Sequence, residues 1–292
     1  MNRIKGILYA AVSSSTFGLA PFFSITLILA GFSAFEVLSY RWGVASIVLI
    51  VFGWLSGCNF RLAGKDWGVV FLLSLLRAVT SFSLIIAYQN IASGVASTIH
   101  FMYPLAVALA MMFFFREKKS LLVILAVLMS LLGAALLSLG ELEAKSGNTM
   151  VGLVAACVSV FSYAGYIVGV RTTRAVQINS TALTCYVMGL GTIFYLIGAY
   201  CTSGLQLVSD GYTWLIILGL ALPATAISNI TLVQAIKYAG PTLTSILGAM
   251  EPLTAVVIGV FVFKELFTVN SAVGIILILL AVSIVVFRRQ KS

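Results

Sequence analysis

The segment Ser97-Thr-Ile-His-Phe-Met-Tyr-Pro104 returns 148 residues later as Ser245-Ile-Leu-Gly-Ala-Met-Glu-Pro252. The same offset pairs Arg116-Glu117 with Lys264-Glu265. A second alignment, of 6–13 (GILYAAVS) with 152–159 (GLVAACVS), has an offset of 146, so small gaps separate the two copies. The chain is therefore a tandem duplication, with one repeat in residues 1–144 and the other in residues 145–292.

Both copies of this segment lie inside long apolar runs. The chain has 292 residues, of which 61% are hydrophobic and 9% charged, and its mean hydropathy is +1.14. A soluble domain carries about 25% charged residues, and a membrane-spanning helix needs about 20 apolar residues. Cutting the sequence at charge and turn clusters gives ten such stretches: 6–30, 34–57, 67–90, 93–115, 121–140, 149–170, 181–203, 213–236, 241–263 and 271–287.

These stretches predict an all-α membrane protein with ten transmembrane helices. In hydrocarbon every backbone N–H and C=O must be paired, which permits only helices or closed barrels, and the runs lack the strict alternation of barrel strands. Five helices per repeat is an odd number, so the second repeat enters the membrane from the opposite side. Two inverted five-helix repeats are typical of secondary transporters, whose substrate site lies between the halves near mid-membrane.

The charges predict the orientation in the membrane. Of the 17 Lys and Arg residues, Arg41 and Arg77 fall inside predicted helices. With the N-terminus placed in the cytoplasm, 13 of the other 15 lie on that side, and only Lys145 and Lys264 lie on the other. This asymmetry follows the positive-inside rule and places both termini in the cytoplasm. The net charge of +9 is thus a topology signal, and a nucleic-acid partner is not expected.

Several motifs of these repeats resemble the drug/metabolite transporter superfamily, in particular its EamA-type ten-helix members. The resemblance covers nearly the whole chain and rests on these motifs: Ser15-Thr-Phe-Gly18, Tyr40-Arg41, Tyr103-Pro104, Arg116-Glu117, Glu251-Pro252, Lys264-Glu265 and Gly274-Ile-Ile-Leu-Ile278. Phe17 departs from the pattern, since family members commonly carry Trp before this Gly. The resemblance implies transport of a small molecule, often export, across a bacterial inner membrane.

Glu251 and His100 are the candidates for proton coupling. An ionisable group near the bilayer centre costs about 3 kcal/mol on insertion scales, so it needs a reason to be there. Glu251 lies near the middle of 241–263, and its helical face includes Gly248. The repeat maps that face onto His100 and Tyr103. Carboxylate and imidazole groups can exchange protons near neutral pH in such surroundings. The structural alternative is that both groups only bond to neighbouring helices.

The two arginines inside predicted helices have different interpretations. Arg77 lies near the middle of 67–90 and either binds a substrate carboxylate or phosphate, or serves as a buried counter-ion of Glu251. These roles do not exclude each other. Arg41 lies closer to the outer end of 34–57, where its long side chain can reach the lipid headgroups.

Further residues are expected to line the pathway or to bend helices. Ser15, Gly18 and Phe22 share one helical face, and Tyr163 and Tyr166 belong to the corresponding helix of the second repeat. With Tyr103 they would suit an organic solute that has an apolar or cationic part. Pro104 and Pro252 occupy equivalent positions, and we expect a paired bend there that suits a rocking motion.

These observations predict a secondary active transporter that works by alternating access. We expect export of a small organic metabolite, with amino acids and related compounds as candidates, coupled to protons. One alternative is an uptake carrier for a cationic or zwitterionic nutrient. Another is an intramembrane enzyme acting on a lipid-linked substrate, but the sequence has no HExxH motif, no clustered Asp and one histidine. The four cysteines have no metal-like spacing, and neither a metal nor a cofactor is expected.

Overall fold

The computed structural model describes residues 2–91, 93–117, 120–138, 147–202, 204–261 and 268–288. These residues form helices joined by short connections, with no strand among them. Seven helical segments of the described chain are long and apolar enough to cross a membrane. Shorter apolar runs in two further helices and a helix pair over 241–261 complete the ten predicted spans.

The first repeat folds into helices that follow its five predicted spans, two of which are broken in the middle. Span one consists of α1 (Asn2–Phe17) and α2 (Ala20–Leu29), span two of α3 (Ala34–Leu55), and span three of α4 (Trp67–Asn90). Span four consists of α5 (Ser93–His100) and α6 (Tyr103–Phe113), and span five of α7 (Leu121–Ser138).

The second repeat contains two uninterrupted spans before its interrupted ones. Span six is α8 (Thr149–Thr172), and span seven is α9 (Ser180–Cys201). Span eight runs through α10 (Gly211–Ala221), the π-helix η4 (Leu222–Ile227) and α11 (Ser228–Ala239). Span nine consists of α12 (Pro241–Leu247) and α13 (Met250–Phe261), and span ten is α14 (Val269–Arg288).

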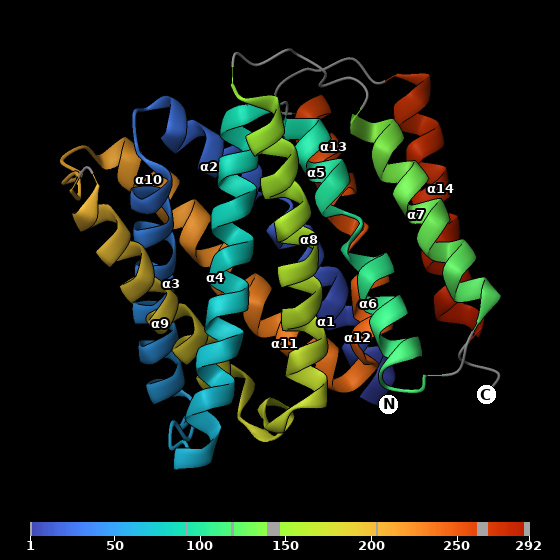
Figure 1. Cartoon of the computed structure of the whole chain (residues 1–292), viewed down its shortest axis with the longest axis horizontal. Helices are drawn as coiled ribbons and strands as arrows, with labels where there is room; N and C mark the ends of the chain where they lie inside the picture. The colour runs from blue at the N-terminus through green and yellow to red at the C-terminus, as the bar shows by residue number, and fades with distance from the viewer. Residues whose placement is uncertain are drawn as a thin grey trace.

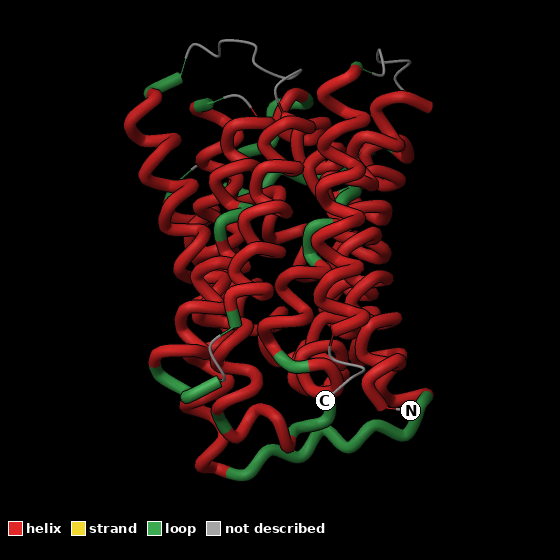
Figure 2. The backbone as a smooth tube through the Cα atoms, turned by 90° about the vertical axis from the view of Figure 1, so that its right-hand side faces the viewer, coloured by secondary structure: helices red, strands yellow, loops and turns green. Residues whose placement is uncertain are grey.

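The two halves run through the bundle in opposite directions. In Figure 1, α1 leads upward into α2, whereas α8, its counterpart in the second half, runs downward. Likewise α5 leads down into α6, and α12 leads up into α13. The beginning of α1 and the end of α14 lie at the same end of the bundle (Figures 1 and 2). The prediction of inverted repeats is therefore confirmed.

The helix packing repeats this symmetry. The most extensive contacts join α4 to α8 and α1 to α11, and exchanging the two halves converts one pair into the other. The other two major contacts, α7 with α14 and α3 with α9, each join a helix to its own counterpart. Figure 1 shows α7 and α14 at one edge of the bundle, and α3 and α9 at the opposite edge.

Three spans break close to the centre of the molecule, and tighter backbone hydrogen bonds close the turns at these breaks. At the breaks the helical bond from residue i to i−4 gives way to the tighter i−3 bond: Leu19 N to Thr16 O, Met102 N to Ile99 O, and Ala249 N to Ile246 O. Such 3₁₀-type turns keep the peptide groups satisfied, as hydrocarbon requires. The breaks before Pro104 and Pro252 lie at equivalent places in the two halves.

Glycine permits the closest backbone approach between α7 and α14. A Cβ atom added to Gly133 would lie 2.7 Å from the carbonyl oxygen of Gly274 and 2.7 Å from the Cγ1 atom of Ile278. A backbone oxygen cannot move aside as the end of a flexible side chain can. Close packing at small residues is a main source of helix association in membranes.

We predict that Gly133→Ala lowers the stability of the detergent-purified protein by about 1–3 kcal/mol, because the added methyl group overpacks this contact. Thermal unfolding would measure the loss. Gly68→Ala is the matched control, since Gly68 lies exposed on α4 and an added Cβ would meet no atom within 4 Å. Equal unfolding temperatures for the two variants would contradict the packing role of Gly133.

Candidate functional site

Arg77 of α4 lies at the centre of the candidate site, with only 1% of its surface exposed. Its Nε donates a hydrogen bond to Asn229 Oδ1 over 3.1 Å, and its Nη1 donates to Ser81 Oγ over 3.4 Å. The guanidinium carbon also lies over three aromatic rings: Phe17 at 5.3 Å, Tyr163 at 5.0 Å and Tyr166 at 5.9 Å. Aromatic faces attract a cation, and a desolvated pair of this kind contributes about 2 kcal/mol.

Arg41 of α3 shares this environment. It is 5% exposed, its Nε donates to Thr225 Oγ1 over 2.6 Å, and its Nη2 donates to the carbonyl oxygen of Ala224 over 3.4 Å. Both acceptors belong to the π-helix η4, one as a side-chain hydroxyl and the other as a backbone carbonyl. The interpretation that Arg41 extends toward lipid headgroups was wrong, because its side chain is buried in the bundle and hydrogen-bonded to η4.

Phe17, the residue that departs from the family pattern, contacts both arginines through its ring. The guanidinium carbons of Arg41 and Arg77 lie 5.5 Å and 5.3 Å from the centre of its ring. Ser15 and Phe22, which the sequence placed on the pathway face, are half-buried. Gly18 instead packs against span nine: an added Cβ would lie 2.7 Å from the carbonyl oxygen of Glu251.

His100 ends α5 and has one nitrogen bonded and one without a partner. Its Nδ1 lies 2.8 Å from Ser159 Oγ, and that hydroxyl donates its own proton to the carbonyl oxygen of Ala156 over 2.6 Å. A hydroxyl has only one proton, so Nδ1–H must be the donor to Ser159. Nε2 is then an acceptor, it is buried, and it has no hydrogen-bond partner among the described residues.

Three tyrosines connect His100 to Arg77 and to the second half. The His100 ring lies 5.4 Å from Tyr163, in a stacked arrangement, and 5.4 Å from Tyr103. Tyr103 reaches span nine at the break, where an added Cβ on Gly248 would lie 1.7 Å from its hydroxyl oxygen. Any larger residue at position 248 would therefore displace Tyr103.

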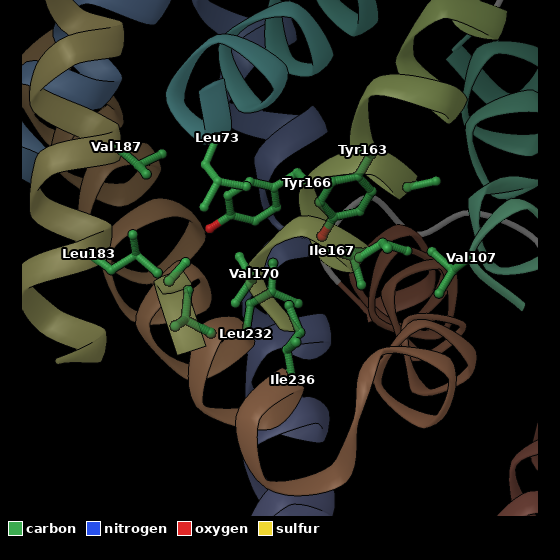
Figure 3. Close-up of a cluster of buried hydrophobic side chains, with 14 of the residues drawn as sticks. Leu73, Val107, Tyr163, Tyr166, Ile167, Val170, Leu183, Val187, Leu232 and Ile236 are labelled. Carbon is green, nitrogen blue, oxygen red and sulfur yellow. The ribbon is translucent and has the colours of Figure 1, made fainter. Parts of the chain in front are cut away.

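Figure 3 shows Tyr163 and Tyr166 side by side above an apolar cluster. The hydroxyl of Tyr166 points among Leu73, Leu183 and Val187, and it has no hydrogen-bond partner among the described residues.

Glu251 occupies the first turn of α13 and is 7% exposed. Its carboxylate forms no ion pair or hydrogen bond with any residue that the structure describes. The carboxylate interacts electrostatically with the positive charges of Arg77 and Arg41. It also interacts electrostatically with the hydroxyl groups of Tyr103 and Tyr163. The direct Arg77–Glu251 pair considered from the sequence is therefore absent among the described residues.

The site thus combines side chains from both halves at the broken spans of an inverted-repeat bundle. A model of the EamA-like transporter family matches residues 4–139 and again residues 150–287. The chain belongs to the EamA-like transporter family. It is 28% identical to an uncharacterized transporter of Archaeoglobus fulgidus over 238 residues, which are 80% of this chain and 83% of that protein.

A solved crystal structure of another protein has the same fold as this EamA-like chain. Its TM-score is 0.81 with 18% sequence identity, and the match covers 100% of this chain and 99% of the other. Family and fold together make this chain a multi-pass membrane transporter.

In the structure several of the ten candidate site residues of this transporter contact one another, and the sequence reasoning missed two of their contact partners. Arg77, Tyr163, Tyr166, His100 and Tyr103 form one connected set of contacts, with Gly248 against Tyr103. Phe17 and Arg41 were left out of the candidate set. The signal for Arg41 was its position inside span two, and Phe17 stood out only as the departure from the family pattern.

We predict that Tyr166→Phe leaves the stability of the transporter unchanged or raises it by about 1 kcal/mol, because an unpaired buried hydroxyl is costly. Thermal unfolding in detergent measures this. Tyr195→Phe is the matched control and should lose about 0.5–1.5 kcal/mol, since the Tyr195 hydroxyl donates to the carbonyl oxygen of Ala78 over 2.8 Å. A larger loss for Tyr166→Phe than for the control would show that its hydroxyl has a partner.

Proposed function

We propose that this transporter exports a small organic metabolite across the bacterial inner membrane by alternating access and in exchange for protons. Amino acids and related compounds are the candidate solutes. The observation that carries the proposal is the set of buried ionisable side chains, Arg41, Arg77, His100 and Glu251, between two inverted halves. Such groups are costly in a membrane interior and mark the routes of ions and polar solutes.

The broken spans support a rocking mechanism. His100 precedes the break of span four, and Glu251 follows the break of span nine, so each group lies at the end of a short helix. A movement of one half against the other changes the surroundings of both groups. A solute favours whichever state it binds better, and it shifts the equilibrium by that difference in affinity.

Glu251 and His100 are the proposed proton carriers. The carboxylate has no fixed counter-ion among the described residues, and Nε2 of His100 is an unoccupied acceptor. If solute binds the ionised form of Glu251, solute and proton exclude each other, and inward proton movement can drive export. Arg77 keeps the site polar in either state.

The aromatic contacts argue against the alternative of a carrier that holds a cationic nutrient in an aromatic cage. A cation-binding cage needs open aromatic faces. Tyr163 already packs against Arg77 and His100, and Tyr166 also packs against Arg77. These rings stabilise the protein's own cation.

We predict that Glu251→Gln abolishes pH-driven flux in proteoliposomes while solute binding persists, because glutamine keeps the size of the side chain but cannot release a proton. An untargeted comparison of metabolites in cells with and without the protein would first identify the solute. Asp210→Asn is the control: Asp210 is exposed and caps α10 through Thr213 N, which asparagine can also do. Unchanged pH-driven flux in Glu251→Gln would reject the coupling role.

We also propose that both termini lie in the cytoplasm, as the distribution of Lys and Arg indicates. A reporter active only in the periplasm should work when fused after Gly140 and remain silent when fused after Arg116. The two fusion points flank span five, so their signals must differ. The reverse pattern of activity would overturn the orientation.

A further inference from the structure

The buried charges of the site do not balance. Arg41 and Arg77 are both in the interior, and among the described residues Glu251 is the one acidic side chain whose charge acts on both. The other buried carboxylate, Glu36, is used elsewhere: it accepts hydrogen bonds from the backbone N–H groups of Ser33 and Gln206. Within the described part of the chain, the two arginines therefore leave one positive charge without a carboxylate partner even when Glu251 is ionised.

Each guanidinium group also has an unused donor. Nε and Nη2 of Arg41 are bonded to η4, and Nε and Nη1 of Arg77 are bonded to Asn229 and Ser81. Nη1 of Arg41 and Nη2 of Arg77 donate no hydrogen bond to any residue in the described ranges. The bonded atoms fix the planes of the two groups, so the free donors are held in place before a ligand arrives.

The ring of Phe17 contacts both cations. Both guanidinium carbons lie within 5.5 Å of one ring centre, although like charges repel. The negative ring face offsets part of this repulsion. An anion between the arginines would offset more of it, and planar guanidinium groups match the oxygens of carboxylates and phosphates.

We infer that Arg41 and Arg77, oriented by Phe17, form an anion-binding subsite that holds a carboxylate or phosphate group of the transported solute. This inference rests on the proposed transport function and specifies its substrate class. The solute carries an oxyanion, and the remainder of the molecule determines which oxyanions are accepted. Arg41 and Phe17 thereby belong to the binding site, together with Arg77.

The test compares acids with neutral analogues on the purified full-length protein. The probes are acetate and acetamide, succinate and succinamide, L-alanine and L-alaninamide, and glycerol phosphate and glycerol. Thermal unfolding is followed over a concentration series of each compound. We expect at least one acid or phosphate to raise the unfolding temperature while its neutral or amidated analogue does not. The phosphate pair separates phosphate from carboxylate recognition.

The variants Arg41→Gln and Arg77→Gln should each raise the half-maximal concentration of the stabilising anion by about 10- to 100-fold, the effect of losing a charge-assisted hydrogen bond. Arg61→Gln, in an exposed loop, is the control and should bind as the wild type does. If a glutamine variant does not fold, Arg41→Lys and Arg77→Lys give the same test. They keep the charge but lose the planar fork, and a loss of about tenfold is expected.

Two results would overturn the inference. One is stabilisation of the wild type by amides or glycerol but by no acid or phosphate of the panel. The other is anion stabilisation that survives both arginine substitutions. Solute flux in proteoliposomes separates this inference from the proposed function. Transport of a neutral solute by both arginine variants would support the transport function and contradict the anion subsite. Arginine-dependent anion binding without any flux would support the anion subsite and contradict the transport function.

Discussion

Every peptide group of this protein within the bilayer must find a hydrogen-bond partner, and this constraint determines where the chain departs from regular helix. The three broken spans tighten from i−4 to i−3 bonding, which pairs the N–H groups of Leu19, Met102 and Ala249 at the breaks. The π-helix η4 widens instead, and its Thr225 hydroxyl and Ala224 carbonyl accept from Arg41. The irregular backbone therefore lies where the charged side chains lie, which is the place where hydrocarbon can tolerate it.

The ten spans and their inversion were predictable from sequence because they depend on simple quantities. Apolar length and the position of charges identify a span, and an odd number of spans per repeat fixes the inversion. Local geometry was less predictable. The shared face of Ser15, Gly18 and Phe22 assumed one continuous helix, but the helix is interrupted between Phe17 and Ala20. Likewise, the depth of Arg41 in the sequence did not reveal the acceptors that η4 offers it.

Symmetry also predicted less about the site than about the fold. The break between α1 and α2 has no counterpart in α8, which runs unbroken from Thr149 to Thr172. The unbroken helix carries Tyr163 and Tyr166 toward Arg77, whereas the broken one ends with Phe17 beneath both arginines. Spans one and six are thus equivalent in the repeat but make different contacts with the arginines. No pattern in the single sequence predicts this difference.

At the paired breaks, packing explains why equivalent positions of the two halves carry different residues. His100 and Tyr103 of the first half occupy the positions of Gly248 and Glu251 in the second. A side chain larger than glycine at position 248 would collide with the Tyr103 hydroxyl, so the aromatic residue of one copy requires the smallest residue in the other. The same exchange places an imidazole on one half and a carboxylate on the other. Because these groups belong to opposite halves, the rocking movement that we propose would change the field between them, and a proton bound there would then have a different affinity in each state.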